Sequence, residues 1–362
     1  MGPAAVTAPR PGGGFQPAST PATDAGSVPN LRFSFADAYR RVEDGGWSRE
    51  VTARELPVAT ALAGVDMRLE AGAIRELHWH KQAEWAYVLE GGARVTAMDA
   101  EGRPFVDDVG AGDLWYFPSG IPHSIQALRE GCELLLVFDD GGFSENATFA
   151  ICDWLAHAPR DAVARSLGIP EGELSGLPAG ERYIFPGAIP GPLDGDRRDG
   201  ADRPPDGFTY RLLRDAPIES AGGRVRIVDS RSFAVSATVA AALVDVEPGG
   251  MRELHWHPNA DEWQYYVEGA GRMTVFAAEG RSRTFDFGAG DVGYVPFAMG
   301  HHIENAGDTR LRFLEMFRAD RFADVSLARW AASTPPGLLA QHLHVEESVL
   351  RRLRTRKEPV VG

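Results

Sequence analysis

Residues 75–85 read RELHWHKQAEW, and residues 252–263 read RELHWHPNADEW. A second stretch also repeats, because GAGDLWYFPSGIPHSIQ (110–126) matches GAGDVGYVPFAMGHHIEN (288–305). The two copies keep the same order and stay about 177 residues apart. Self-similarity at a fixed spacing indicates an internal duplication, so the chain is predicted to contain two copies of one folding unit.

Each copy is rich in short segments that favour β-strands. Stretches such as 85–98, 113–120 and 132–140 combine β-branched and aromatic residues, and Gly, Pro and Asp-Gly interrupt them. Several short strands at this spacing predict an antiparallel barrel or sandwich. Helical patterns follow within 146–168 and 323–354, so short helices are expected after each barrel.

Shifts in composition divide the chain further. Residues 1–30 are rich in Pro, Gly, Ala and Thr, lack the apolar core of a signal peptide, and are expected to form a flexible arm. Residues 189–207, rich in Pro, Gly and Asp, are expected to link the two units. The first unit is then predicted to span 31–188 and the second 208–362, each including its helices.

The overall composition excludes several classes of protein. The net charge is −14 at pH 7, which argues against nucleic acid or an anionic membrane as a partner. No run of about 18 apolar residues exists, so no membrane span is expected. The two cysteines, Cys132 and Cys152, are too few for a disulfide framework or a CxxC site, and they favour a reducing, cytoplasmic location.

The repeated stretches carry the residue types of a metal site. Two histidines two residues apart on a strand place both imidazoles on one face, a glutamate follows after a turn, and another histidine comes from the second repeated stretch. In the second copy the glutamate is one residue further on, which a bulge or a longer turn can absorb. The predicted ligands are His78, His80, Glu84 and His123 in the first copy, and His255, His257, Glu262 and His301 in the second.

Three imidazoles and one carboxylate leave open coordination positions and suit Mn²⁺, Fe²⁺, Ni²⁺ or Zn²⁺. A single His-x-His pair is more often structural than metal-binding. Here six of the ten histidines fall into the two sets in register, which favours metal binding. Trp79 and Trp256 lie between the paired histidines and must point to the opposite strand face, where packing against a helix or a subunit is expected.

The motifs HWHKQAEW with GDLWYFPSGIPH, and HWHPNADEW with GDVGYVPFAMGH, are similar to the two motifs of the cupins. Their occurrence twice in one chain resembles the bicupins, and FDDGGFSENATF, FTYRLL and PIES bring the resemblance closest to bacterial oxalate decarboxylases. It extends from about residue 31 to about residue 345. It implies a mainly β protein of two jelly-roll-like, double-stranded β-helix barrels, Mn²⁺ at each site, and a homo-oligomer that is a trimer or a dimer of trimers.

The resemblance also implies an activity and site residues. Oxalate and a proton would become formate and CO₂, with dioxygen as co-catalyst but without net oxidation. Arg75 and Arg252 fall on the family's substrate arginines, and Glu145, within SENAT, falls on the proton-handling position of a mobile lid. Glu315 falls on a carboxylate near the second metal, where it would pair with Arg252 or handle a proton. The first site is expected to be the main catalytic one because the lid follows it. At Ala147 many members carry Ser.

The residues themselves support these roles but leave alternatives open. Oxalate can occupy a metal position and accept charge-assisted bonds from a guanidinium. Arg75 and Arg252 precede the histidines by three residues, so strict alternation turns them away unless each strand starts or kinks near Gly72 or Gly250. Glu145 in a closed site can be the general acid that protonates the carbon left by C–C cleavage. The Ser-Glu pair can also simply begin a helix, with the serine as N-cap.

Three other functions remain open at this stage. An oxalate oxidase would produce CO₂ and hydrogen peroxide on the same scaffold. A non-catalytic bicupin that binds a carboxylate or a sugar would be expected to lose metal ligands, whereas this chain keeps all eight. A bicupin dioxygenase would be expected to hold a larger apolar pocket for an aromatic substrate.

Overall fold

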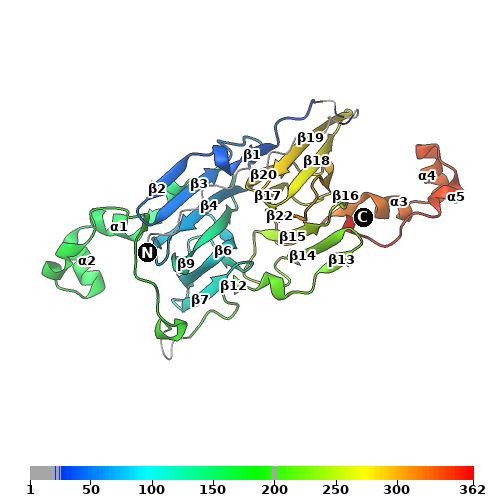
Figure 1. Ribbon diagram of the computed structural model, residues 1–362. Helices are drawn as coiled ribbons and strands as arrows, with labels where there is room; N and C mark the ends of the chain where they lie inside the picture. Colours follow the sequence, from blue (N-terminus) through cyan, green and yellow to red (C-terminus); the bar gives the residue numbers. More distant parts are fainter. Residues whose placement is uncertain (1–20, 22–23, 25, 198–201) are drawn as a thin grey trace.

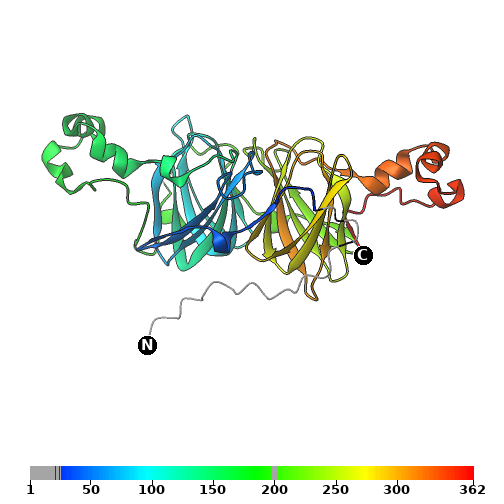
Figure 2. The same cartoon turned by 90° about the horizontal axis from the view of Figure 1, so that it is seen from above.

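The structure is a computed structural model that describes residues 21, 24, 26–197 and 202–362. Two β-barrels lie side by side, and each carries a helical arm that points away from the other barrel (Figures 1 and 2). Most of the arm predicted at 1–30 and the centre of the predicted linker at 189–207 lie outside the described residues. The mainly β architecture of two barrels with short helices confirms the predicted fold class.

Antiparallel strands build both barrels. The strands of the first are β2 (Arg40–Glu43), β3 (Gly46–Val51), β4 (Ala63–Leu69), β5 (Ile74–Trp79), β6 (Glu84–Met98), β7 (Pro104–Gly110), β8 (Leu114–Phe117), β9 (His123–Phe138), β10 (Phe149–Ala150) and β11 (Ile184–Phe185). Those of the second are β13 (Ile218–Ser220), β14 (Gly223–Val228), β15 (Ala240–Val246), β16 (Met251–Trp256), β17 (Glu262–Glu268), β18 (Ala270–Ala277), β19 (Arg281–Gly288), β20 (Asp291–Val295), β21 (Gly300–Asn305), β22 (Leu311–Phe317), β23 (Val325–Ser326) and β24 (Val360–Val361).

Alternation along the strands produces three apolar layers. In β6, Trp85 and Tyr87 face the other barrel, whereas Ala86 and Val88 face the interior of their own. Trp263 of the second barrel belongs to the same layer between the barrels. Separate cores fill the interior of the first and of the second barrel. Both sheet faces of the central strands are therefore buried, and the two barrels share a continuous apolar interface.

Two short strands are exchanged between the barrels. β1 (Arg32–Ser34), which precedes the first barrel, pairs with β20 of the second. β12 (Thr209–Tyr210), which precedes the second barrel, pairs with β8 of the first. Arg32 also forms an ion pair with Asp291 of β20 at 2.7 Å. Each barrel is thus completed by a segment that lies next to the other barrel in the sequence.

The predicted helices follow each barrel. The first arm contains α1 (Ile151–His157) and α2 (Arg160–Leu167), and the second contains α3 (Leu327–Ser333), α4 (Pro336–Leu343) and α5 (Glu347–Leu350). Among the described residues, no helix has the length and apolar character needed to cross a membrane. Cys132 and Cys152 are both free.

Candidate metal centres and substrate site

A β-bulge turns the predicted substrate arginines into the barrels. The pairing of β5 with β9 shifts register between Arg75 and His78, and the pairing of β16 with β21 shifts between Arg252 and His255. The extra residue cancels the alternation that would point arginine and histidine to opposite faces. Arg75 is 1% exposed and Arg252 is 0% exposed. The prediction that each strand starts or kinks near the preceding glycine is confirmed for the start, since β5 begins at Ile74 and β16 at Met251. The kink itself lies further on, between the arginine and the histidine.

The four predicted ligands of the first barrel meet in its interior. Their ligand atoms all lie within 4.8 Å of one another, and all four residues are buried. Glu84 Oε2 lies 3.3 Å from His80 Nε2 and 3.4 Å from His123 Nε2. Atoms that bind one ion at about 2.1 Å and at right angles lie roughly 3 Å apart. The spacing therefore fits a divalent cation. Burial by itself raises the pKa of Glu84, but the adjacent His123 and His80 outweigh that effect and lower it.

The second barrel holds the equivalent set. Glu262 Oε2 lies 3.0 Å from His257 Nε2 and 2.8 Å from His301 Nε2. The extra residue before Glu262 is absorbed in the turn, since β17 begins at this glutamate as β6 begins at Glu84. The Nε2 atoms of His255, His257 and His301 are buried and lack a hydrogen-bond partner among the described residues. A bound cation would satisfy these inward-facing lone pairs.

All six histidines are oriented in the same way by backbone carbonyls. Each Nδ1 lies within hydrogen-bond distance of a carbonyl oxygen, which assigns the proton to Nδ1 and leaves the Nε2 lone pair for a cation. The pairs are His78–Glu76 (2.6 Å), His80–Gln82 (2.7 Å), His123–Ile121 (2.8 Å), His255–Glu253 (2.7 Å), His257–Ala323 (2.8 Å) and His301–Met299 (3.0 Å). Both centres are therefore built in the tautomer that a metal requires.

Different residues hold the two ligand glutamates. Trp115 Nε1 donates to Glu84 Oε1 at 2.8 Å in the first barrel, and Gln264 Nε2 donates to Glu262 Oε1 at 2.7 Å in the second. The strand register places Gly293 where the first barrel has Trp115. A Cβ at Gly293 would lie 2.4 Å from Gln264 Oε1, so the glycine makes room for the glutamine. The same hydrogen bond is thus supplied from two different strands.

Replacing Trp115 with phenylalanine is expected to weaken manganese binding in the first barrel by about 10- to 100-fold, because Glu84 loses its orienting donor. Manganese titration of the chelator-stripped protein would measure this. Because the second barrel uses Gln264 instead, its affinity should stay unchanged in the same sample. Equal weakening of both sites would contradict the assignment.

Arg75 and Glu145 face each other beside the first centre. Arg75 Nη2 lies 3.5 Å from Glu145 Oε2, and both side chains are buried. The guanidinium also stacks on the ring of Tyr183, 4.3 Å from its centroid. Burial and the nearby Glu145 raise the pKa of Tyr183 well above its ordinary value. Both Nη atoms of Arg75 and Oε2 of Glu145 lack hydrogen-bond partners among the described residues, so this site can still bind an anion.

The predicted lid is a short 3-10 helix (Glu145–Ala147) whose backbone is held from the barrel. The N–H of Glu145 donates to Glu50 Oε1 at 2.7 Å, and Glu50 Oε2 accepts from Arg54 at 3.3 Å. Burial, above all, raises the pKa of Glu50. Ser144 stands at the N-cap position of this helix, as predicted, but its side chain makes no cap hydrogen bond. Glu50 supplies the acceptor instead.

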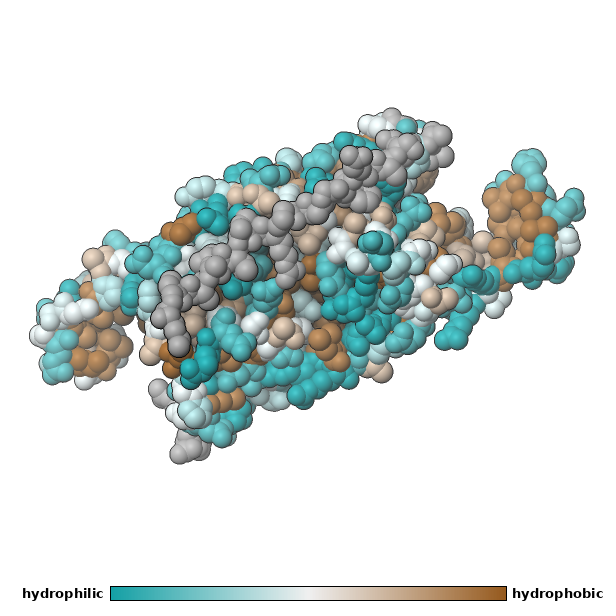
Figure 3. Space-filling view, viewed as in Figure 1, coloured by the Kyte–Doolittle hydropathy of each residue, from teal (hydrophilic) through white to brown (hydrophobic). Residues whose placement is uncertain are grey.

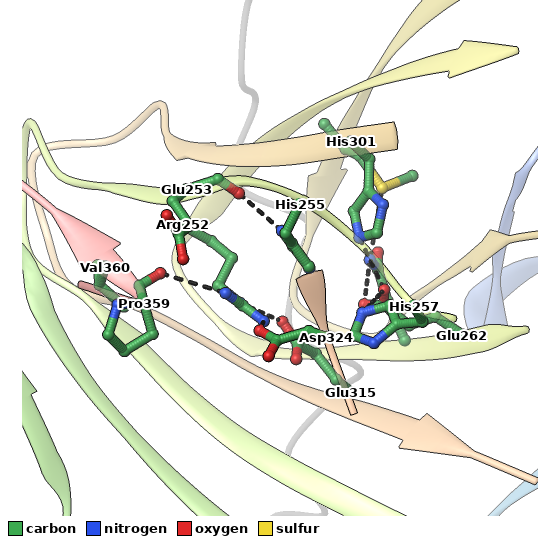
Figure 4. A network of polar contacts seen from close by, with 12 residues as sticks. Arg252, Glu253, His255, His257, Glu262, His301, Glu315, Asp324, Pro359 and Val360 are labelled. Atoms are coloured by element: carbon green, nitrogen blue, oxygen red, sulfur yellow. Dashed lines mark hydrogen bonds and ion pairs between the residues drawn. The ribbon is translucent and has the colours of Figure 1, made fainter. Parts of the chain in front are cut away.

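The second-barrel arginine has a different environment (Figure 4). Arg252 Nε donates to Glu315 Oε1 at 2.9 Å, Nη2 donates to Asp324 Oδ2 at 2.9 Å, and Nη1 donates to the Pro359 carbonyl at 3.4 Å. Glu315 therefore pairs with Arg252, one of its two predicted roles. All three nitrogens of this guanidinium bind the protein itself, in contrast to Arg75.

Sequence reasoning missed Glu50, Trp115, Tyr183 and Gln264 as parts of these sites. Trp115 lies in the second repeated motif, but the other copy has Gly293 there, so the repeat gives no sign of its role. Glu50, Tyr183 and Gln264 lie outside the quoted motifs and reach the sites only through the fold. The predicted packing of Trp79 and Trp256 on helices is what the structure shows: Trp79 contacts Trp154 of α1 and Trp256 contacts Trp330 of α3.

Comparison with known proteins identifies the family. The Cupin family profile matches residues 33–173 and 210–350. Oxalate decarboxylase OxdC of Bacillus subtilis is 59% identical over 94% of this chain and 89% of its own length, and a probable oxalate decarboxylase of Arthroderma benhamiae is 40% identical over 94% and 85%. The solved structure of the Bacillus subtilis enzyme at pH 4.6 has a TM-score of 0.92 with 59% identity, covering 94% of this chain and 90% of that one. The chain therefore belongs to the cupin family, as a bicupin of the oxalate decarboxylase group.

Proposed function

We propose that this protein is an oxalate decarboxylase that acts at the first barrel. The observation that carries the proposal is the convergence of Arg75 and Glu145 beside a buried set of three histidines and one glutamate. The two Nη groups of Arg75 make no hydrogen bond within the described residues, and Glu145 lies on a lid. A cationic clamp, an acid and a metal are the three elements that a small dianion needs for cleavage and protonation. The relatives named as oxalate decarboxylases support the choice of substrate.

We propose Mn²⁺ as the ion of both centres. The donor set of imidazoles and carboxylate, without thiolate, suits it. One solved structure that matches this chain with a TM-score of 0.92 and 58% identity comes from work on the Mn(II) centres of Bacillus subtilis oxalate decarboxylase. When bound, the ion acts as a Lewis acid and a template for one substrate carboxylate.

The side chains of the first site divide the remaining work. Arg75 would hold oxalate oxygens through its two free Nη groups with charge-assisted hydrogen bonds. After the C–C bond breaks, one carboxylate leaves as CO₂ and the remaining carbon takes a proton from Glu145, giving formate. Glu50 holds the lid backbone so that this carboxyl group stays in the buried site. A proton delivered promptly prevents loss of electrons from the intermediate, which would instead give the oxidase reaction.

Product analysis tests the proposal. Manganese-loaded protein supplied with oxalate in air should release formate and CO₂ in equal amounts, with little peroxide. Dioxygen is proposed as co-catalyst, so removing it should stop formate production although no net oxidation occurs. Peroxide formed in step with oxalate loss would identify an oxidase, and unchanged oxalate would indicate a non-catalytic bicupin.

We further propose that the protein forms a trimer or a dimer of trimers through its helical arms, and that it works in the cytoplasm. Figure 3 shows apolar patches on both arms at opposite ends of the molecule. Trp154 is 63% exposed and Trp330 is 59% exposed. Exposed apolar patches of this kind mark association surfaces. The two free cysteines suit a reducing compartment.

Lysine in place of both Trp154 and Trp330 is expected to convert the oligomer to monomers, because charged groups would have to be buried in the contact. The mass of the wild-type and variant proteins in dilute solution measures this. Lysine at Ser166, an exposed polar position of the first arm, is the control and should leave the oligomer intact. A monomeric wild type would contradict the proposal.

A further inference from the structure

We infer that Asp324, held in place by the C-terminal segment, is the residue that closes the second barrel to carboxylate ligands. The inference rests on the proposed function, since it concerns which barrel accepts oxalate. It starts from a group that we call the Arg252 cluster, which consists of Arg252, Glu315, Asp324 and Lys357. In this cluster Arg252 donates to both carboxylates, and Asp324 also pairs with Lys357.

Strand register defines what the first barrel has at the position of Asp324. β23 pairs with β16 so that Val325 lies opposite Trp256, and β10 pairs with β5 so that Phe149 lies opposite Trp79. The residue before each short strand is Asp324 in the second barrel and Thr148 in the first. The alignment of the two repeats by sequence places Asp324 near the equivalent of Glu145, but the register assigns it to Thr148. A neutral side chain therefore stands in the first barrel where the second has a carboxylate.

At a second position, too, the second barrel has a carboxylate where the first barrel has a neutral side chain. In β22, Glu315 pairs with Ala242 and Gln264, and in β9 the residue with the equivalent pairings is Leu136. Within the part of the chain that the structure describes, Arg75 therefore pairs with one carboxylate, that of Glu145 in the lid. Arg252 pairs with two carboxylates, those of Glu315 and Asp324. Glu315 lies in β22 and Asp324 directly precedes β23, so neither belongs to a lid helix.

The C-terminal segment covers the second site from the same side that Tyr183 covers the first. β24 pairs with β16 through Val360 and Arg252, as β11 pairs with β5 through Ile184 and Arg75. The Pro359 carbonyl accepts from Arg252 Nη1, and Lys357, two residues earlier, pairs with Asp324. Asp324 is thus held by a hydrogen bond from Arg252 (Figure 4) and by its ion pair with Lys357.

The charges explain why this arrangement excludes oxalate. The Arg252 cluster holds two cations and two anions, with Arg252 and Glu315 fully buried and Asp324 nearly so. A dianion that approached the second metal would find no free guanidinium donor and two buried carboxylates of its own sign. In the first barrel the same approach meets two Nη groups that make no hydrogen bond within the described residues, and the residue in register with Asp324 is the neutral Thr148. Asp324 therefore decides between the two barrels.

An exchange of the two residues tests the inference by binding, not by turnover. Equilibrium dialysis with labelled oxalate would use manganese-loaded protein with Glu145→Ala, which keeps Arg75 but lacks the acid. This protein should bind one oxalate per chain. Adding Asp324→Thr should raise the number to two, while Asp320→Thr, a control on the exposed part of the same loop, should leave it at one. A stoichiometry of one in the Asp324→Thr protein, with two manganese ions still bound, would overturn the inference.

The reciprocal substitution decides the matter even if Asp324→Thr loses the second ion. Thr148→Asp introduces a carboxylate at the position that the register makes equivalent to Asp324. It should weaken oxalate binding at the first site at least about tenfold, with manganese retained, because repulsion equivalent to one pKa unit changes a binding constant by that factor. Thr148→Asn has the same shape without the charge and should bind within about threefold of the parent. Equal affinity of the Asp and Asn variants would refute the role of the charge. Failure of the proposed function is recognised separately: an oxidase would release peroxide in the product assay, and a bicupin that does not act on oxalate would leave the parent protein without bound oxalate.

Discussion

Replacing Glu145 with alanine should reduce formate production by about 10²-fold or more while both barrels keep their manganese, because a positioned general acid contributes a factor of this size. The side chain is buried against Arg75 and comes from the lid, and among the described residues it is the carboxyl group that pairs with that guanidinium. Oxalate consumption that persists should shift toward peroxide. Formate release and metal content, measured on the same sample, check both parts.

Two controls sharpen this test. Glu145→Gln keeps the size and polarity of the side chain but cannot donate a proton in the same way, so it should be as impaired as Glu145→Ala. Glu173→Ala removes an exposed glutamate that follows α2, outside the lid, and should have wild-type activity. Undiminished formate production by both Glu145 variants would exclude this residue as the acid.

Arg75→Ala should lower kcat/KM for oxalate by about 10²-fold or more, since charge-assisted hydrogen bonds to a buried anion are worth about 1.5–3 kcal/mol each. Arg75→Lys should recover only part of the loss, because an ammonium group lacks the planar fork of donors. Added guanidinium ion should partly restore the alanine variant by filling the space beside Tyr183. Steady-state kinetics with and without guanidinium measure these effects.

An exposed arginine close to the same strand supplies the control for this series. Arg182 lies over the ring of Phe185 and is exposed, so Arg182→Ala should leave kcat/KM unchanged. If Arg75→Ala bound and converted oxalate as well as Arg182→Ala, the clamp would have to be another residue.

The fold could be predicted because the same motifs occur twice in the sequence. Two copies of the same motifs fix two barrels, and the spacing of the histidines on one strand requires that their rings share a face. The exchange of β1 and β12 between the barrels could not be predicted, since each is a short segment whose partner lies far along the chain. Pairing of that kind depends on the packed arrangement of the barrels and leaves no local pattern.

The site was predictable to a similar extent. The eight ligand positions recur in register, so they could be identified without a structure. The bulge that brings Arg75 and Arg252 to the metal face has no local marker, because it depends on how β5 and β16 pair with their neighbours. The same is true of Asp324 and Lys357, which reach Arg252 only through the fold. The difference between the barrels is therefore visible only once side chains are placed.

Crystals of the manganese-loaded Glu145→Gln protein soaked in oxalate, with diffraction data collected at the manganese absorption edge, test the central claim most directly. We expect an anomalous peak at each set of three histidines and one glutamate, with oxalate between the first peak and Arg75 and no oxalate at the second peak. Absence of both peaks, or oxalate bound away from Arg75, would contradict it.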